Sequence, residues 1–125
     1  MVEPLIEAMA KAIQAVIQWP EKRIQLFHHN DSDGISSGAI LTRAFERKGF
    51  GVNRFCLEKP YPKILDRVFK QEGKLIVFAD FAGRIAPLIS DLNRGRNLVL
   101  ILDHHKAEPA TDPMVRSTQC ASSVR

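Results

Sequence analysis

The most constraining feature of the sequence is an apolar run that ends abruptly in one acidic and two imidazole side chains. Leu98–Leu102 contains only branched apolar residues, and Asp103, His104 and His105 follow at once. Such a run is typical of a strand buried on both faces, where a charged side chain would be costly. We therefore expect the triplet at the point where the strand leaves the sheet, which is where open α/β sheets build their sites.

Two earlier segments repeat this pattern. Residues 24–27 run into a segment rich in histidine and aspartate, and residues 75–79 run into an acid. Because parallel strands end at one edge of a sheet, these polar side chains should meet there. The residues expected at this edge are His29, Asp31, Asp33, Asp80, Asp103, His104 and His105.

Strand and helix patterns alternate along the chain with short connections, which predicts an α/β fold. The expected strands cover about 23–28, 52–57, 75–79 and 98–102, and helical spacing of apolar residues marks about 36–48, 60–73 and 85–95. We predict a parallel sheet of four to five strands with helices on both faces. An amphipathic helix should occupy most of 1–22, and 107–125 should be an exposed loop and the beginning of a truncated helix. The whole chain, 1–125, is expected to form one domain with its motif-bearing core at 23–106.

Length and composition favour a globular protein of the cytoplasm. The chain has 125 residues, of which 45% are hydrophobic and 26% charged. No segment reaches the roughly 20 apolar residues that cross a membrane, and the two cysteines form no metal-binding or disulfide pattern. The net charge of +4 suits an anionic partner such as nucleic acid, although a mildly basic surface explains it equally well.

The Asp31-x-Asp33-Gly34 segment can place two carboxylates toward a cation if the backbone turns sharply at the glycine. A helix beginning near Ser36 would add N–H groups suited to a phosphate. His29 would complete a mixed nitrogen and oxygen set that favours manganese, zinc or iron. Aspartate and glycine also cluster in ordinary turns, so this segment by itself has a structural alternative.

The other polar residues have structural alternatives too. The histidine pair could belong to a polar loop, and Asp80 could cap a helix. Arg84 and Lys106 could hold phosphate oxygens or be solvated surface bases. The conjunction of three strand ends favours function, because clustered carboxylates repel one another and a pair of divalent cations, roughly 3.5 to 4 Å apart, would relieve that repulsion.

The segments His29–Gly34, Asp80 and Asp103–His105 resemble, in order and spacing, motifs I, II and III of the DHH phosphoesterase superfamily, especially its RecJ-like nucleases. The resemblance covers roughly residues 23 to 106. It implies a manganese-dependent phosphodiesterase with two metal ions, for which magnesium could substitute, acting on single-stranded nucleic acid or short oligonucleotides. It also implies individual roles: His29 and Asp31 bind one metal, Asp33 and His104 the other, Asp80 bridges them, His105 contacts the scissile phosphate, and Asp103 supports the histidines.

The chain also departs from the family pattern. Members have a fourth motif with another metal-binding aspartate and then a second domain that grips the substrate, whereas this sequence ends first. Asp112 is too close to the third motif to be the missing ligand. The alternative to an enzyme is therefore a truncated, non-catalytic module that binds metal, nucleic acid or a partner, with a homodimer or partner chain covering the truncated edge of the sheet. A nucleotide-binding or response-regulator-like domain would not explain the histidine pair, and the sequence contains no glycine-rich phosphate loop.

Overall fold

The computed structural model describes residues 10, 14, 17, 19–58, 62–79, 85–102, 112 and 114–118, with the backbone alone described at 33, 62 and 116–118. Of the segment 1–22, in which the N-terminal helix was expected, Ala10, Gln14 and Ile17 have helical backbone, and residues 19–22 are described and are not helical. The other residues of that segment lie outside the described part of the chain. No helix in the described part of the chain is long and apolar enough to span a bilayer.

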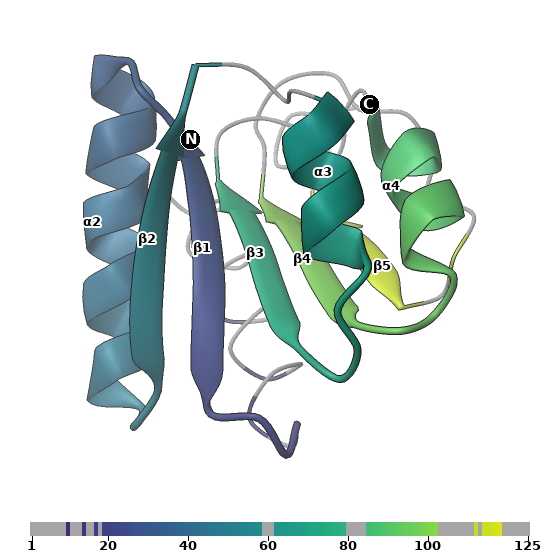
Figure 1. Ribbon diagram of the computed structural model, residues 1–125. Helices are drawn as coiled ribbons and strands as arrows, with labels where there is room; N and C mark the ends of the chain where they lie inside the picture. Colours follow the sequence, from purple (N-terminus) through teal and green to yellow (C-terminus); the bar gives the residue numbers. More distant parts are fainter. Residues whose placement is uncertain are drawn as a thin grey trace, which may run out of the picture.

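Five parallel strands form one sheet in the order β2-β1-β3-β4-β5 (Figure 1). The strands are β1 Arg23–His29, β2 Gly51–Leu57, β3 Leu75–Ala79, β4 Leu98–Leu102 and β5 Val115–Thr118. The predicted parallel sheet of four to five strands is confirmed.

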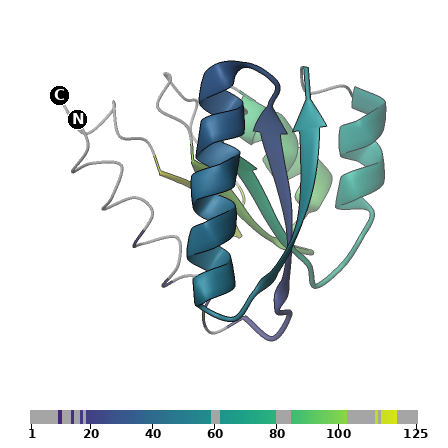
Figure 2. The ribbon, with the colours of Figure 1, turned by 90° about the vertical axis from the view of Figure 1, so that its left-hand side faces the viewer.

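Three described helices connect the strands. They are α2 Ser32–Arg47, α3 Pro62–Phe69 and α4 Ala86–Asn93. Helix α2 covers one face of the sheet, and α3 and α4 cover the other (Figures 1 and 2). The expectation of helices on both faces is therefore correct.

The core has two halves, one on each face of the sheet. Alternate residues of the strands point to opposite faces, so Leu26 and Val77 pack with Leu41 and Phe45 of α2, whereas Phe78 packs on the side of α3 and α4. Every residue of β3 and β4 is buried. This explains why both strands are uninterrupted apolar runs in the sequence.

The structure corrects two predicted boundaries. Helix α2 begins at Ser32, not near Ser36, so the first motif leads directly into the helix. Residues 115–118 form β5, which pairs with β4, where a loop and the start of a helix were expected. The short segment has no long apolar run because only Val115 is a large apolar residue, and neighbouring β4 supplies the hydrogen bonds that make it a strand.

The carboxyl ends of the three central strands are in register. His28 of β1 lies beside Ala79 of β3, and Ala79 lies beside Leu102 of β4. The chain runs from β1 outward to β2 and then returns to the other side of β1 as β3, so the strand order reverses between β1 and β3. Open α/β sheets bind ligands at such a reversal, outside the carboxyl ends of the strands.

Candidate metal-binding edge of the sheet

Two adjacent histidines at the end of β1 have different environments. His28 points toward α2 and is 4% exposed, whereas the side chain of His29 is 32% exposed at the carboxyl edge. The alternation of a strand separates them, because neighbouring residues point to opposite faces. One histidine is therefore part of the interior and the other part of the edge.

The buried imidazole of His28 has a defined set of neighbours. Its Nδ1 lies 2.9 Å from the backbone oxygen of His29, and its Nε2 lies 3.4 Å from a guanidinium nitrogen of Arg54. A carbonyl only accepts and a guanidinium only donates, so Nδ1 carries the hydrogen and Nε2 accepts. The ring lies against Gly38 of α2, where an added Cβ would come within 2.7 Å of it. His28 thus helps to seat α2 on the sheet.

The edge histidine pairs with the first aspartate of the motif. His29 Nδ1 lies 3.0 Å from Asp31 Oδ2, and the Asp31 side chain is 54% exposed. The other carboxylate oxygen of Asp31 accepts a hydrogen bond from the Gly34 backbone N–H at 2.8 Å. Asp31 is therefore the N-cap of α2 and also a partner of His29, and its negative charge lies at the positive end of the helix dipole.

Gly34 has a different role from the one expected. It lies inside the first turn of α2 and has no positive φ, so the sharp turn predicted at this residue is wrong. A Cβ built there would lie 2.3 Å from the backbone oxygen of His29. Glycine is needed because the helix begins directly against the end of β1, which holds His29 and Asp31 close to the first turn.

The described residues include only part of the predicted site. His29 and Asp31 come together, and Asp33 belongs to the first turn of α2 by its backbone. Within the described ranges no group of three histidine, cysteine, aspartate or glutamate side chains is arranged to hold a metal. The remaining predicted residues lie outside the described part of the chain: Asp80, Arg84, Asp103, His104, His105 and Lys106. Asp80 and Asp103 directly follow the last residues of β3 and β4 in the sequence.

Asp112 lies at the opposite edge of the sheet, before β5 begins. Its carboxylate accepts hydrogen bonds from the backbone N–H groups of Gly95 at 2.6 Å and Met114 at 2.9 Å, and from the Asn93 side chain at 2.9 Å. Burial acts to raise its pKa, but these three hydrogen bonds outweigh burial and hold the pKa below its usual value. Asp112 thus has a structural role at the beginning of the strands, whereas His29 lies at their end. This position agrees with the expectation that Asp112 is not the missing metal ligand.

The sequence did not reveal the role of His28 or of Gly38. The spacing of the glycines could have indicated both roles, because a histidine on the side of β1 that faces the helix requires a small residue opposite it on that helix. Gly38 follows Gly34 by four residues, so both glycines lie on the face of α2 that packs on the sheet.

With the fold and this edge established, comparison with known proteins places the chain in a family. Residues 23–125 match the DHH family, N-terminal domain, and the chain belongs to that family. It is 31% identical over 105 residues to the uncharacterized protein MJ0831 of Methanocaldococcus jannaschii. That match covers 80% of this chain but 23% of the relative, so the chain spans about a quarter of the relative's length.

Solved structures share the fold, which is RecJ-like. RecJ of Thermus thermophilus in complex with Mn²⁺ has a TM-score of 0.62 at 24% identity, over 91% of this chain and 17% of RecJ. An exonuclease RecJ bound to manganese gives 0.64 at 24% identity, over 90% of this chain and 30% of that chain. CDC45 from Entamoeba histolytica gives 0.68 at 23% identity, over 89% of this chain and 24% of CDC45.

Proposed function

We propose that this chain is the metal-binding half of a DHH-family phosphoesterase that hydrolyses phosphodiester bonds of single-stranded nucleic acid or short oligonucleotides. The observation that carries the proposal is the register of His28, Ala79 and Leu102 across three adjacent strands. The first motif follows the first of these positions, and the sequence continues from the other two into Asp80 and Asp103. The strand residues that precede the three motifs in the sequence therefore lie in one row, which supports the proposal.

The described donors fit a divalent ion. His29 Nδ1 and Asp31 Oδ2 are separated by 3.0 Å and come from the same strand end. One imidazole nitrogen and one carboxylate oxygen are donors that manganese accepts.

The proposed roles extend the pair to the full set of motif residues. His29 and Asp31 would hold one Mn²⁺ and Asp33 and His104 the second, with Asp80 shared between them, while Asp103 would support the histidines and His105 would contact the phosphate. Bound ions of this kind supply an activated water and neutralise phosphate charge, and Mg²⁺ is a candidate substitute. Arg84 and Lys106 are proposed to hold phosphate oxygens. Two of the structural relatives, the RecJ proteins, are described with manganese, which supports this choice of ion.

The test is hydrolysis of a 5′-labelled single-stranded oligonucleotide by the 125-residue chain with added Mn²⁺. Asp80→Ala should abolish turnover, because the proposal gives that carboxylate to both ions. Asp66→Ala is the matched control, since Asp66 is an exposed carboxylate of α3 that pairs with Lys70 at 3.3 Å. This control should retain full activity.

The second candidate, a non-catalytic module that binds metal, nucleic acid or a partner, predicts a different outcome. It predicts that the folded chain binds Mn²⁺ but does not hydrolyse the oligonucleotide. Equilibrium dialysis against Mn²⁺, run on the same preparation, separates the two candidates. Turnover that survives in Asp80→Ala would reject the proposed metal site itself.

A further inference from the structure

The outer edge of β2 is open in the described part of the chain. β2 is the first strand of the sheet and pairs with β1 on one side only. Figure 2 looks toward this edge, with α2 beside β2. The edge lies at the other end of the sheet from β5.

β2 lacks several of the features that keep an edge strand from pairing, although it carries one charged side chain, Arg54, whose guanidinium lies 3.4 Å from His28. It is seven residues long, has neither proline nor lysine, and pairs with β1 one residue to one residue over its whole length, without a bulge. Natural edge strands are commonly short, bulged, covered, or marked by lysine or proline. A regular edge of this kind is suited to accept another strand.

The direction of the backbone groups follows from one hydrogen bond. The Gly51 N–H donates to the Lys22 carbonyl, so Gly51 faces β1. Because successive residues of a strand alternate in direction, Asn53, Phe55 and Leu57 also face β1. Val52, Arg54 and Cys56 therefore present their N–H and C=O groups outward.

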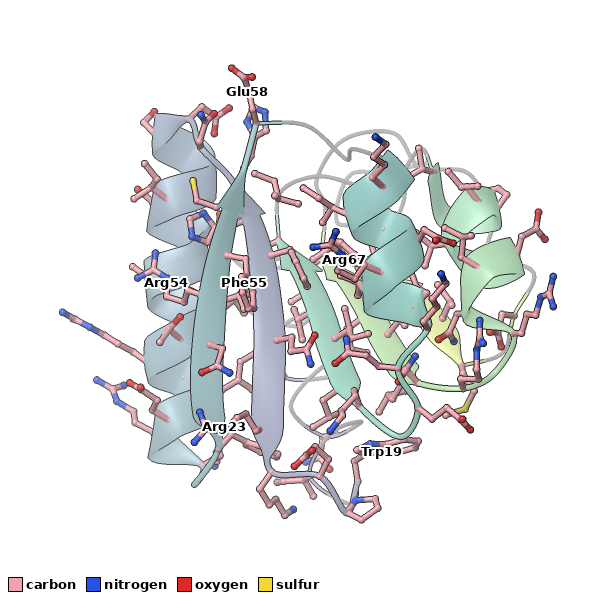
Figure 3. All side chains as sticks on the ribbon, viewed as in Figure 1. Trp19, Arg23, Arg54, Phe55, Glu58 and Arg67 are labelled. Atoms are coloured by element: carbon pink, nitrogen blue, oxygen red, sulfur yellow. The ribbon has the colours of Figure 1, made fainter. Side chains whose placement is uncertain are left out.

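A row of stacked aromatic rings ends at the same edge. Phe78 of β3 stacks on Phe27 of β1 at 5.3 Å between ring centroids, and Phe27 stacks on Phe55 of β2 at 4.9 Å. Phe78 is fully buried and Phe27 nearly so, whereas Phe55 is 43% exposed. Figure 3 shows Phe55 at this margin of the sheet, near Arg54 of the same strand. The next side chain in the row would have to come from a further strand.

We propose that β2 pairs antiparallel with β2 of a second copy of this chain, about a two-fold axis at Cys56. In this register Arg54 lies opposite Glu58 of the other copy, and Phe55 lies opposite Leu57. Glu58 is exposed and directly follows β2 (Figure 3). Opposite charges and an aromatic–aliphatic pair directly across an antiparallel ladder are both stabilising.

The charges select this register among the symmetric ones. An axis at Arg54 would place the guanidinium groups of the two copies opposite each other, and an axis at Phe55 would leave both charges without a partner across the ladder. An axis at Cys56 also makes Cys56 a hydrogen-bonded pair, since its backbone groups point outward. Each protomer thus supplies one Arg54 and one Glu58 to the pairing, and the two-fold axis repeats each contact, as an isologous interface must.

Charge reversal tests the register in solution. Sedimentation equilibrium should show a concentration-dependent dimer of the 125-residue chain, and Arg54→Glu or Glu58→Arg alone should raise the dissociation constant at least about tenfold. Mixing the two single variants should restore association, because the heterodimer again pairs opposite charges at both positions. Restoration also shows that both variants are folded. Asp91→Lys, a charge reversal at an exposed residue of α4, which packs near β5 at the far end of the sheet, serves as a control and should dimerise like the parent chain.

A second measurement is independent of the charged residues. In a Cys120→Ser background, a short bis-maleimide should link Cys56 to Cys56 in the parent chain and much less in Arg54→Glu. A chain that remains monomeric to about 1 mM, or single variants that dimerise like the parent, would overturn the proposal. Neither result bears on hydrolysis, so the inference and the proposed function can fail separately.

Discussion

The two edges of the sheet differ in how their polar side chains are bound. At the amino edge, where the strands begin, polar side chains form a hydrogen-bonded network, whereas at the carboxyl edge, where the strands end, a histidine and an aspartate form a partly exposed pair. Asn93, Asn97 and Asp112 tie together the beginnings of three strands and the end of α4. His29 and Asp31 are 32% and 54% exposed. The same residue types therefore stabilise the fold at the amino edge, where backbone and amide donors bind them, and we expect them to bind a ligand at the carboxyl edge, where they are partly exposed to solvent.

The largest expected effect comes from the amino edge. Asn97 is 0% exposed, and its side chain accepts from the Lys74 N–H and donates to the Gln71 carbonyl and to Asn93. Asn97→Ala should lower the free energy of unfolding by about 3 kcal/mol, because three hydrogen bonds are lost and buried groups remain unsatisfied. Urea denaturation measures this. Asn53→Ala, on the exposed strand β2, is the control and should change the free energy of unfolding by no more than about 0.5 kcal/mol. Equal losses in both variants would contradict a stabilising role for the Asn97 hydrogen bonds.

Asp112 should show the next largest effect, and it should depend on pH. Asp112→Asn places an amide NH₂ against fixed donors and should cost about 2 kcal/mol at neutral pH. Because the folded state lowers the pKa of Asp112, its contribution is fully present above the unfolded value of about 3.9 and is lost as pH falls toward the folded pKa. The stability gap between the parent chain and Asp112→Asn should therefore narrow below about pH 4. A gap that stays constant down to pH 2 would exclude this linkage.

At the carboxyl edge, Gly34→Ala sharpens the comparison. The new Cβ meets the backbone of His29, which cannot move away alone, so the cost should be about 1.5 kcal/mol even after the higher helix propensity of alanine. The affinity for Mn²⁺ should also fall, because the displaced backbone carries the proposed ligand His29. In Gly38→Ala the added Cβ meets the His28 ring and not the backbone at the edge, so Mn²⁺ affinity should be retained. Thermal unfolding and Mn²⁺ titration of both variants distinguish the two glycines.

The sequence predicted the regular parts of the fold well and the edges of elements poorly. The apolar runs of β3 and β4 are buried on both faces, and this is the condition under which periodicity is most informative. β5 was missed because its position depends on pairing with β4 and not on its own composition. The start of α2 was placed four residues late because Asp31 acts as an N-cap, and the motif looked like a loop.

The candidate site was predictable as a set of residues but not as an arrangement. Motif spacing pointed to His29 and Asp31, and these two do come together. The sequence could not show that Asp31 also caps α2, or that His28 faces the opposite side, since both depend on how closely α2 begins after β1. Gly34 was correctly singled out but for the wrong reason, because a close approach and a turn both favour glycine.

The smallest effect on stability should come from the edge histidine. His29→Ala removes a partly exposed ion pair with Asp31, so the free energy of unfolding should change by less than about 0.5 kcal/mol. The affinity for Mn²⁺, measured by the free-ion electron paramagnetic resonance signal, should nevertheless fall at least about tenfold, because a nitrogen donor is lost. His28→Ala is the matched control and should show the reverse, with lower stability and unchanged affinity, since His28 is buried against α2. Equal Mn²⁺ affinity in His29→Ala and the parent chain would remove His29 from the ligand set and with it the functional contrast between the two edges.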